Sequence, residues 1–128
     1  MTGHHAVLVD VDGTVTAETF DAINLDTLTS ALDVRYVDCV QVQPLNCTNT
    51  ATLDAWVDDE GLFNSPPNPV ASKMIATLAE SSCQMLYGRV LFATGDLTTG
   101  ESIGLSVEKK DQLVVMGSLL ARLLAPMM

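Results

Sequence analysis

The sequence has few basic residues: 6 Lys and Arg stand against 16 Asp and Glu, and the formal net charge is −10. A protein of this sign repels phosphate backbones and anionic membranes at long range, so we expect no direct binding to DNA and no membrane association. The acids are scattered, and their densest run is Asp58-Asp59-Glu60. We therefore interpret the charge as a solubility feature, with an acidic face that mimics nucleic acid or meets a basic partner as the alternative.

A membrane-spanning segment, a signal peptide and a cysteine framework are also missing. The longest apolar stretch, residues 113–128, is interrupted by Gly117, Ser118, Arg122 and Pro126, which makes it too short to span a bilayer. A signal peptide requires Lys or Arg before its apolar segment, and neither residue precedes the first apolar run here. The 3 cysteines have no Cys-x-x-Cys spacing. We expect a cytoplasmic protein with no metal site and no cofactor.

The remaining composition is that of an ordinary folded chain. Hydrophobic residues make up 48% and charged residues 17% of the 128 residues, which predicts a single globular domain over residues 1–128. Alternating or continuous apolar runs predict strands at residues 5–11, 15–23, 35–43, 52–58 and 86–94. Apolar residues at helical spacing follow the capping residues Asn24, Asn68 and Ser106.

The order of these elements indicates the fold class. The strands come in adjacent pairs, and such pairs form antiparallel sheets. We therefore predict an α+β fold, with a mostly antiparallel sheet of about five strands and two to three helices packed on one of its faces. Residues 95–104 are predicted to be a loop rich in Gly and Thr, and whether that loop binds anything stays open.

One segment is similar to a catalytic motif. Residues 7–15, Val-Leu-Val-Asp-Val-Asp-Gly-Thr-Val, resemble the first motif of the haloacid-dehalogenase superfamily. The resemblance implies that Asp10 is a nucleophile, that Asp12 is a general acid/base, and that the pair helps to hold Mg²⁺. Residues 91–95 resemble the strand that ends in a phosphoryl-gripping Thr, here Thr94. A magnesium-dependent phosphatase is therefore one alternative function.

The chain order argues against that alternative. The superfamily builds its site at the carboxyl edge of a doubly wound parallel sheet, which needs alternating strands and helices. Here Asp12-Gly13 predicts a two-residue hairpin turn, which makes the next strand antiparallel. Lys109 or Lys110 and Asp111 could serve as the cation and the metal ligand, but they fall within a segment predicted to be helical. Only 17 residues follow Asp111, which leaves no room for the strand-ending acidic pair that completes the metal site. We therefore expect no catalytic residues.

A second resemblance extends over nearly the whole chain. The sequence is similar to the family catalogued as domain of unknown function thirty-eight forty-six, found mostly in actinobacteria, their plasmids and their phages. The shared features are the Val-Asp-Val-Asp-Gly-Thr-Val hairpin, Leu25-x-x-Leu28, residues 37–42, Asp59-Glu60-Gly61, Pro67-Asn68-Pro69-x-Ala71, and Leu86-Tyr87-Gly88-x-Val90 followed by Gly95 and Asp96. The resemblance implies no enzyme activity, and it implies a phage, plasmid or actinobacterial setting, with the host cytoplasm as the compartment.

The segment 64–68 is the most distinctive candidate for binding. Its prolines hold the chain extended, so Asn64, Pro66, Pro67 and Asn68 could be presented to a partner as a rigid surface. The alternative is that Asn68 only caps the following helix, with Pro69 at its first position. Trp56 is a further candidate contact residue, although one face of its strand must be buried.

Three functions remain open from the sequence. The first is a small, acidic, non-enzymatic binding or interaction protein. Its partner would be an unidentified host or phage protein, and the binding could modulate a host process. A homodimer is a further option, since the final helix is hydrophobic. The second function is small-ligand binding, for example of a nucleotide at residues 95–104. The third is the phosphatase that uses Asp10 and Asp12.

Overall fold

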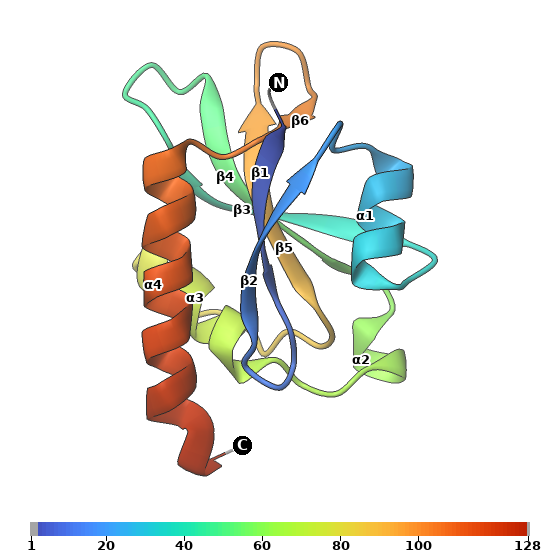
Figure 1. Cartoon of the computed structure of the whole chain (residues 1–128), viewed down its shortest axis with the longest axis vertical. Coiled ribbons are helices and arrows are strands. Elements are labelled where there is room, and N and C mark those ends of the chain that lie inside the picture. The colour runs from blue at the N-terminus through green and yellow to red at the C-terminus, as the bar shows by residue number, and fades with distance from the viewer. Residues whose placement is uncertain (1–2, 128) are drawn as a thin grey trace.

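The computed structural model describes residues 3–127 and has an antiparallel six-stranded sheet with helices around it (Figure 1). The α+β class predicted from the sequence is confirmed. The sheet order is β2-β1-β5-β4-β3, and β6 pairs with β5. The elements are β1 (His4–Val9), β2 (Val15–Phe20), α1 (Leu25–Leu32), β3 (Val37–Pro44), β4 (Ala51–Asp58), α2 (Gly61–Asn64), α3 (Pro69–Ala79), β5 (Val90–Asp96), β6 (Ser102–Ile103), α4 (Val107–Leu124) and the 3₁₀ turn η1 (Ala125–Met127).

The opening hairpin forms as predicted, with a loop one residue longer. Val9 pairs with Val15 across β1 and β2, and the Asp10 amide donates to the Thr14 carbonyl at 2.9 Å. The loop is therefore residues 11–13. Gly13 has a φ of 90°, which belongs to the left-handed side of conformational space where a side chain is disfavoured. A three-residue hairpin loop needs a residue of this kind at its last position.

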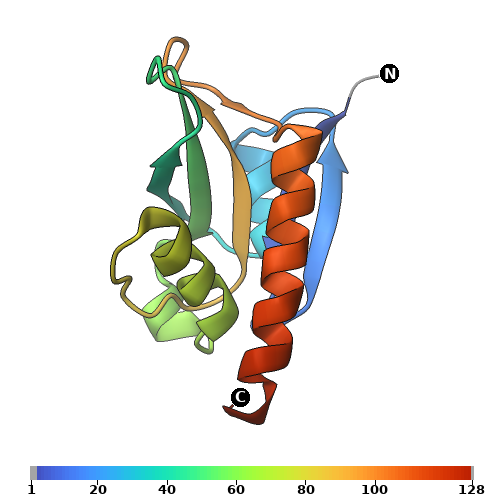
Figure 2. The same cartoon turned by 90° about the vertical axis from the view of Figure 1, so that its left-hand side faces the viewer.

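Helices cover both faces of the sheet, so the predicted placement on one face is wrong. Figure 2 looks at one face of the sheet, with α3 and α4 in front of the strands and α1 behind them. On β1, Val7 and Val9 belong to the core under α3 and α4, while Ala6 and Leu8 pack in the core under α1. Because successive residues of a strand point to opposite faces, a strand that is apolar at every position is buried from both sides.

The predicted helix starts are confirmed at all three caps. The side chains of Asn24, Asn68 and Ser106 accept hydrogen bonds from backbone amides three residues further on. Helix α4 packs closely on the sheet at Gly117, where an added Cβ would lie 2.9 Å from a Val15 methyl and 3.1 Å from the Met74 sulfur. No helix among residues 3–127 has the length and apolar character to cross a membrane.

The segment from residue 86 to residue 104 differs most from its prediction. Strand β5 begins at Val90 instead of residue 86, because Gly88 turns the chain with a φ of 87° and donates its amide to the Pro66 carbonyl at 2.8 Å. At its other end, β5 continues to Asp96 and pairs with β6. The predicted loop 95–104 is thus largely a hairpin.

Candidate functional site

The two aspartates of the phosphatase-like motif lie at the end of β1 that carries the hairpin loop. Asp10 forms an ion pair with Arg89, with 3.3 Å between Oδ2 and Nε. Asp12 is at the loop tip, where its Oδ1 accepts from the Thr14 amide at 2.9 Å. That backbone hydrogen bond, together with one from the Thr14 side chain, lowers the pKa of the Asp12 carboxyl. Asp12 therefore stabilises the turn in its charged form.

Thr94 lies at the opposite end of the sheet. Val9 pairs with Val90 in the antiparallel β1–β5 ladder, and Thr94 is four residues beyond Val90. At a rise of about 3.4 Å per residue, Thr94 is roughly 14 Å from the Asp10 end. Helix α4, which contains Lys109, Lys110 and Asp111, also begins at the Thr94 end of the sheet (Figure 1). The structure does not bring together the residues that the phosphatase resemblance names.

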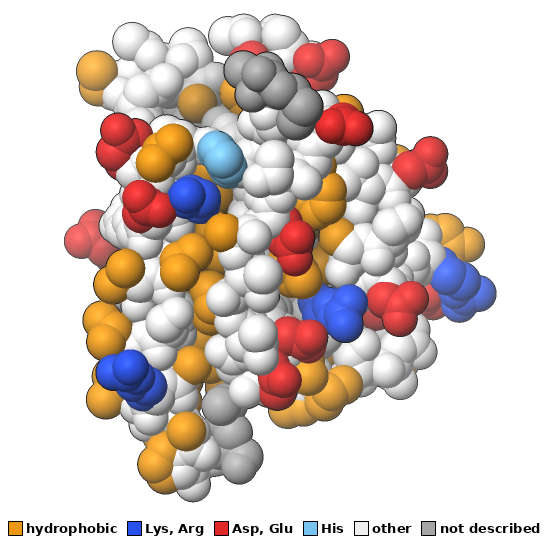
Figure 3. Space-filling model, viewed as in Figure 1, with side chains coloured by type: hydrophobic (Ala, Val, Ile, Leu, Met, Phe, Trp, Pro, Cys, Tyr) orange, Lys and Arg blue, Asp and Glu red, His pale blue; other side chains and the backbone are white. Residues whose placement is uncertain are grey.

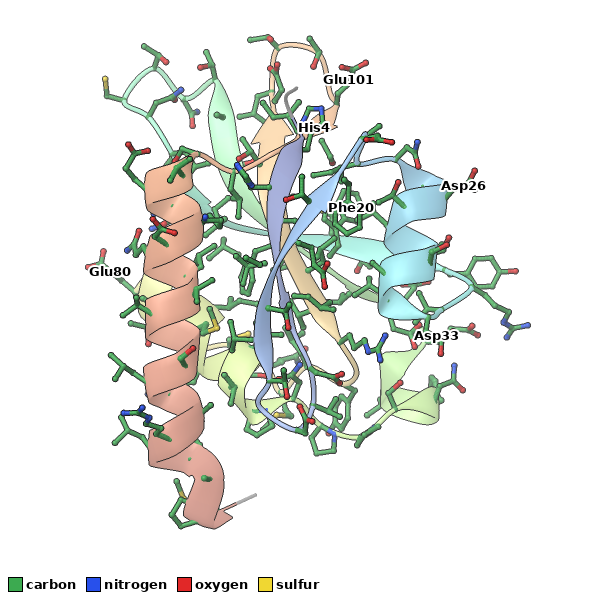
Figure 4. The ribbon with its side chains drawn as sticks, viewed as in Figure 1. His4, Phe20, Asp26, Asp33, Glu80 and Glu101 are labelled. Carbon is green, nitrogen blue, oxygen red and sulfur yellow. The ribbon has the colours of Figure 1, made fainter. Side chains whose placement is uncertain are left out.

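A cleft of about 410 Å³ lies at the Asp10 end, where β1 and β4 end and β5 begins. Its walls include two of the predicted binding residues, Asn64 and Pro66, both of which are exposed. Pro67 is also exposed but does not line the cleft. Asp33 caps the end of α1 that points toward α2, as Figure 4 shows, and lines the same cleft. The sequence pattern predicted Asn64 and Pro66 as candidate binding residues, but it did not indicate that the end of α1 also lines this cleft.

Both arginines of the cleft are already paired with carboxylates. Its four carboxylates are those of Asp10, Asp33, Asp58 and Glu60, against the two guanidinium groups of Arg35 and Arg89. The Arg35 guanidinium bonds the Glu60 carboxylate at 3.2 Å. The Arg89 guanidinium pairs with Asp10 and also donates to a backbone carbonyl of α1. An acidic cleft whose arginines are engaged suits a cationic group better than a phosphate.

Asn68 is a structural residue, and its predicted presentation to a partner is wrong. Its side chain is completely buried. Oδ1 accepts from the Ala71 amide at 3.1 Å as the cap of α3, and Nδ2 donates to the carbonyls of Val9 at 3.0 Å and Gly88 at 2.9 Å. All these groups are buried, and an unpaired amide there would be costly. Asn68 therefore joins the end of β1, the approach to β5 and the start of α3.

Trp56 lies on the face of the sheet that α1 covers, where it packs against the cluster that contains Leu28 and Leu32 of α1. Its indole Nε1 is buried and has no hydrogen-bond partner among the described residues. Trp56 is half-buried, and it does not line the cleft to which Asn64 and Pro66 contribute.

The hairpin between β5 and β6 carries no group that would favour an anion. Asp96 accepts from the hydroxyl and the amide of Thr98, and these two bonds lower the pKa of its carboxyl. An aspartate held in its charged form at this turn repels phosphate. The described part of the chain also has no group of three His, Cys, Asp or Glu side chains that could hold a metal ion.

The outer face of α4 is an apolar surface that the described part of the fold leaves uncovered. Val115, Leu119 and Leu123, four residues apart, are 58%, 53% and 71% exposed. Beside them runs a groove of about 630 Å³ that reaches Thr77 of α3. Figure 3 shows hydrophobic side chains gathered along α4, whereas the acidic side chains are spread over the rest of this view. Sequence analysis identified the helix but not its exposed face, because apolar residues of a core and of a docking surface look alike in a sequence.

Comparison with protein-family models, curated proteins and solved structures gave no match. The resemblance to the domain of unknown function family therefore stays a prediction, and the function has to be argued from the geometry.

Proposed function

We propose that this protein is a non-catalytic interaction domain that binds a protein through the outer face of α4. The observation that carries the proposal is the exposure of Val115, Leu119 and Leu123 beside an apolar groove. A helix that is apolar all around is normally buried on every side. From residue 113 to residue 124, α4 has a single charged residue, Arg122, so its outer face has the composition of an interface.

The inner face of the same helix supports this reading. Leu113 and Gly117 are buried against the sheet and α3, so the fold already uses one apolar side of α4. The stability of the domain therefore does not require the outer leucines. Exposed leucines are an aggregation hazard unless they are covered in the cell. A protein partner would cover them.

The biological source that the family resemblance implies indicates which kind of protein the partner is. The family resemblance implies a phage, plasmid or actinobacterial protein, and a host or phage protein is then the partner of the first hypothesis. Such a domain would act by occupying a surface of its partner, and it would modulate a host process without chemistry of its own.

Site-specific photo-crosslinking in an actinobacterial host tests the proposal. A photoreactive amino acid replaces Leu119 in one variant and Thr99, an exposed residue of the β5–β6 hairpin, in the control variant. We expect covalent protein adducts at position 119 and none of the same mass at position 99. Identical adduct patterns at the two positions, or none at 119, would refute the proposal.

Small-ligand binding is a second candidate, supported by the cleft at the Asp10 end, whose volume of about 410 Å³ is in the range of ligand sites. The excess of carboxylates favours an amine or guanidinium ligand over the nucleotide considered from the sequence. A thermal-shift series with polyamines and with nucleotides tests it, since a bound ligand raises the melting temperature by mass action. A flat response to both would exclude this candidate. The geometry gives no support to the phosphatase, because Thr94 and Asp10 are at opposite ends of the sheet.

A further inference from the structure

We propose that the partner of the α4 face is a second copy of this chain, with the two α4 helices packed antiparallel about a twofold axis. This inference rests on the proposed function, because it assumes that the outer face of α4 is an interface. It goes further by naming the occupant as another copy of the chain, in place of the host or phage protein of the first hypothesis, and by giving the direction of its helix. The spacing of apolar residues, the position of two charges, the local charge of α4 and the size of the surface support it.

Four residues of α4 that we call the seam have the spacing found in paired helices. Gln112, Met116, Leu119 and Leu123 follow one another at intervals of four, three and four residues. This is the spacing of the a and d positions in helices that wind around each other. The same four residues line the groove between α4 and α3. A partner helix laid along this groove would therefore meet apolar side chains from Val115 to Leu123, with the polar Gln112 at one end.

Two charges beside the seam favour an antiparallel arrangement of identical helices. Asp111 and Arg122 are 11 residues apart, which is about three turns, so they lie on the same flank of the seam. In an antiparallel pair, like flanks of the two helices face each other, and Asp111 of one copy would meet Arg122 of the other, twice by symmetry. In a parallel pair, the two residues would be separated by roughly 16 Å along the axis.

Both residues are available for such a contact. Arg122 is exposed and has no ion pair among residues 3–127. The Asp111 side chain is 64% exposed, and its ion pair with the neighbouring Lys110 leaves it accessible. A surface pair of this kind contributes about 0–1 kcal/mol, so it selects the direction of pairing more than it supplies affinity.

The charge of α4 is unlike that of the rest of the chain. The helix contains two acidic and three basic residues, while the whole protein has 16 acidic and 6 basic residues. Two molecules of net charge −10 repel each other over most of their surfaces. The α4 face is a region where a second copy can approach without meeting an excess of carboxylates. An isologous contact brings this same face of both copies together.

The size of the face suits a reversible dimer. Helix α4 has 18 residues, and at 1.5 Å per residue it is about 27 Å long and about 10 Å wide. With the adjoining shoulder of α3, each copy would bury roughly 450 Å², or about 900 Å² for the pair, near the lower limit for specific interfaces. We therefore expect a dimer whose dissociation constant is in the micromolar range, roughly 1–100 μM.

Sedimentation equilibrium of the purified chain tests the proposal. We expect the mass to rise from 13.6 kDa toward twice that value as the concentration rises through the micromolar range. Leu119→Asp should weaken the dimer by about 100-fold or more, because it places a charge in the seam. Phe63→Asp is the matched control: Phe63 is an exposed apolar residue of α2, at 86%, and its replacement should leave the dimer unchanged.

A charge-reversal pair tests the direction of the helices. Asp111→Arg and Arg122→Asp should each weaken association by about tenfold, and the double variant should restore it. Failure of the double variant to rescue would overturn the antiparallel arrangement. Circular dichroism and thermal melting of every variant confirm that the fold is intact.

The two proposals fail in different ways. A mass of 13.6 kDa at all concentrations would overturn the homodimer, and protein adducts at position 119 in cells would then still support the interaction function. A dimer that persists in Leu119→Asp would overturn the use of α4 by the second copy. A monomer with no adducts at position 119 would overturn both.

Discussion

The Asn68 side chain donates from Nδ2 to the carbonyl oxygen of Val9 at 3.0 Å, across 59 positions of the sequence. The same amide group also bonds the Gly88 carbonyl, and its oxygen caps α3. A single buried side chain thus connects the first strand, the approach to β5 and a helix on one face of the sheet. Three segments that are remote in sequence depend on one residue at this point.

Replacement of Asn68 by Ala should lower the free energy of unfolding by roughly 3 kcal/mol, since it removes a cap and leaves two buried carbonyls without a donor. Asn24→Ala is the matched control, because Asn24 caps α1 in the same way but is exposed. We expect a loss of about 1 kcal/mol for that variant. Urea denaturation measures both, and equal losses would show that the long-range bonds of Asn68 contribute nothing.

The second prediction concerns Asp10. The intact chain should not hydrolyse p-nitrophenyl phosphate in the presence of Mg²⁺, because Asp10 is paired with Arg89 and Thr94 is at the far end of the sheet. Asp10→Asn should cost no more than about 1 kcal/mol of stability, as expected for a partly exposed ion pair. Turnover that depends on Mg²⁺ and disappears in Asp10→Asn would contradict the geometry.

The third prediction concerns the thiols. Burial, together with the neighbouring Asp54 carboxylate, raises the pKa of the Cys39 thiol to about 12. The neutral thiol is thus favoured in the fold, and this contribution to stability is present below pH 9 and is lost as the pH rises toward 12. At pH 8, a thiol reagent should label exposed Cys47 much faster than Cys39. In Cys47→Ser the fast phase should vanish, and a remaining fast phase from Cys39 would contradict this account.

The fourth prediction concerns Gly95 of β5. A Cβ at this position would overlap the Asp54 carboxylate and lie 2.9 Å from the Thr52 hydroxyl. Gly95→Ala should therefore destabilise the fold by about 1–3 kcal/mol. The cost should shrink in an Asp54→Ala background, since contacting residues are coupled. Gly100→Ala serves as control: it meets no atom within 4 Å, so only its φ of 77° opposes a side chain. A Gly95→Ala variant as stable as the parent chain would show that this contact is not tight.

The sequence predicted the features that depend on neighbouring residues. Asn24, Asn68 and Ser106 cap helices because a short polar side chain reaches an amide three residues ahead, whatever the rest of the chain does. Gly13 turns the first hairpin because a glycine, which has no Cβ, adopts a positive φ without steric strain. The antiparallel class of the sheet followed from strands joined by short turns.

The tertiary structure decided what covers each apolar surface. The apolar run of β1 was visible in the sequence, but only the fold placed α1 on one side and α3 with α4 on the other. It also separated Thr94 from Asp10 and buried Asn68, because strand order and direction fix which ends of the sheet meet. The leucines of α4 divide into a buried side and an exposed side for the same reason. Local patterns are set by neighbours within a few residues, whereas burial depends on which distant segments pack against each side chain.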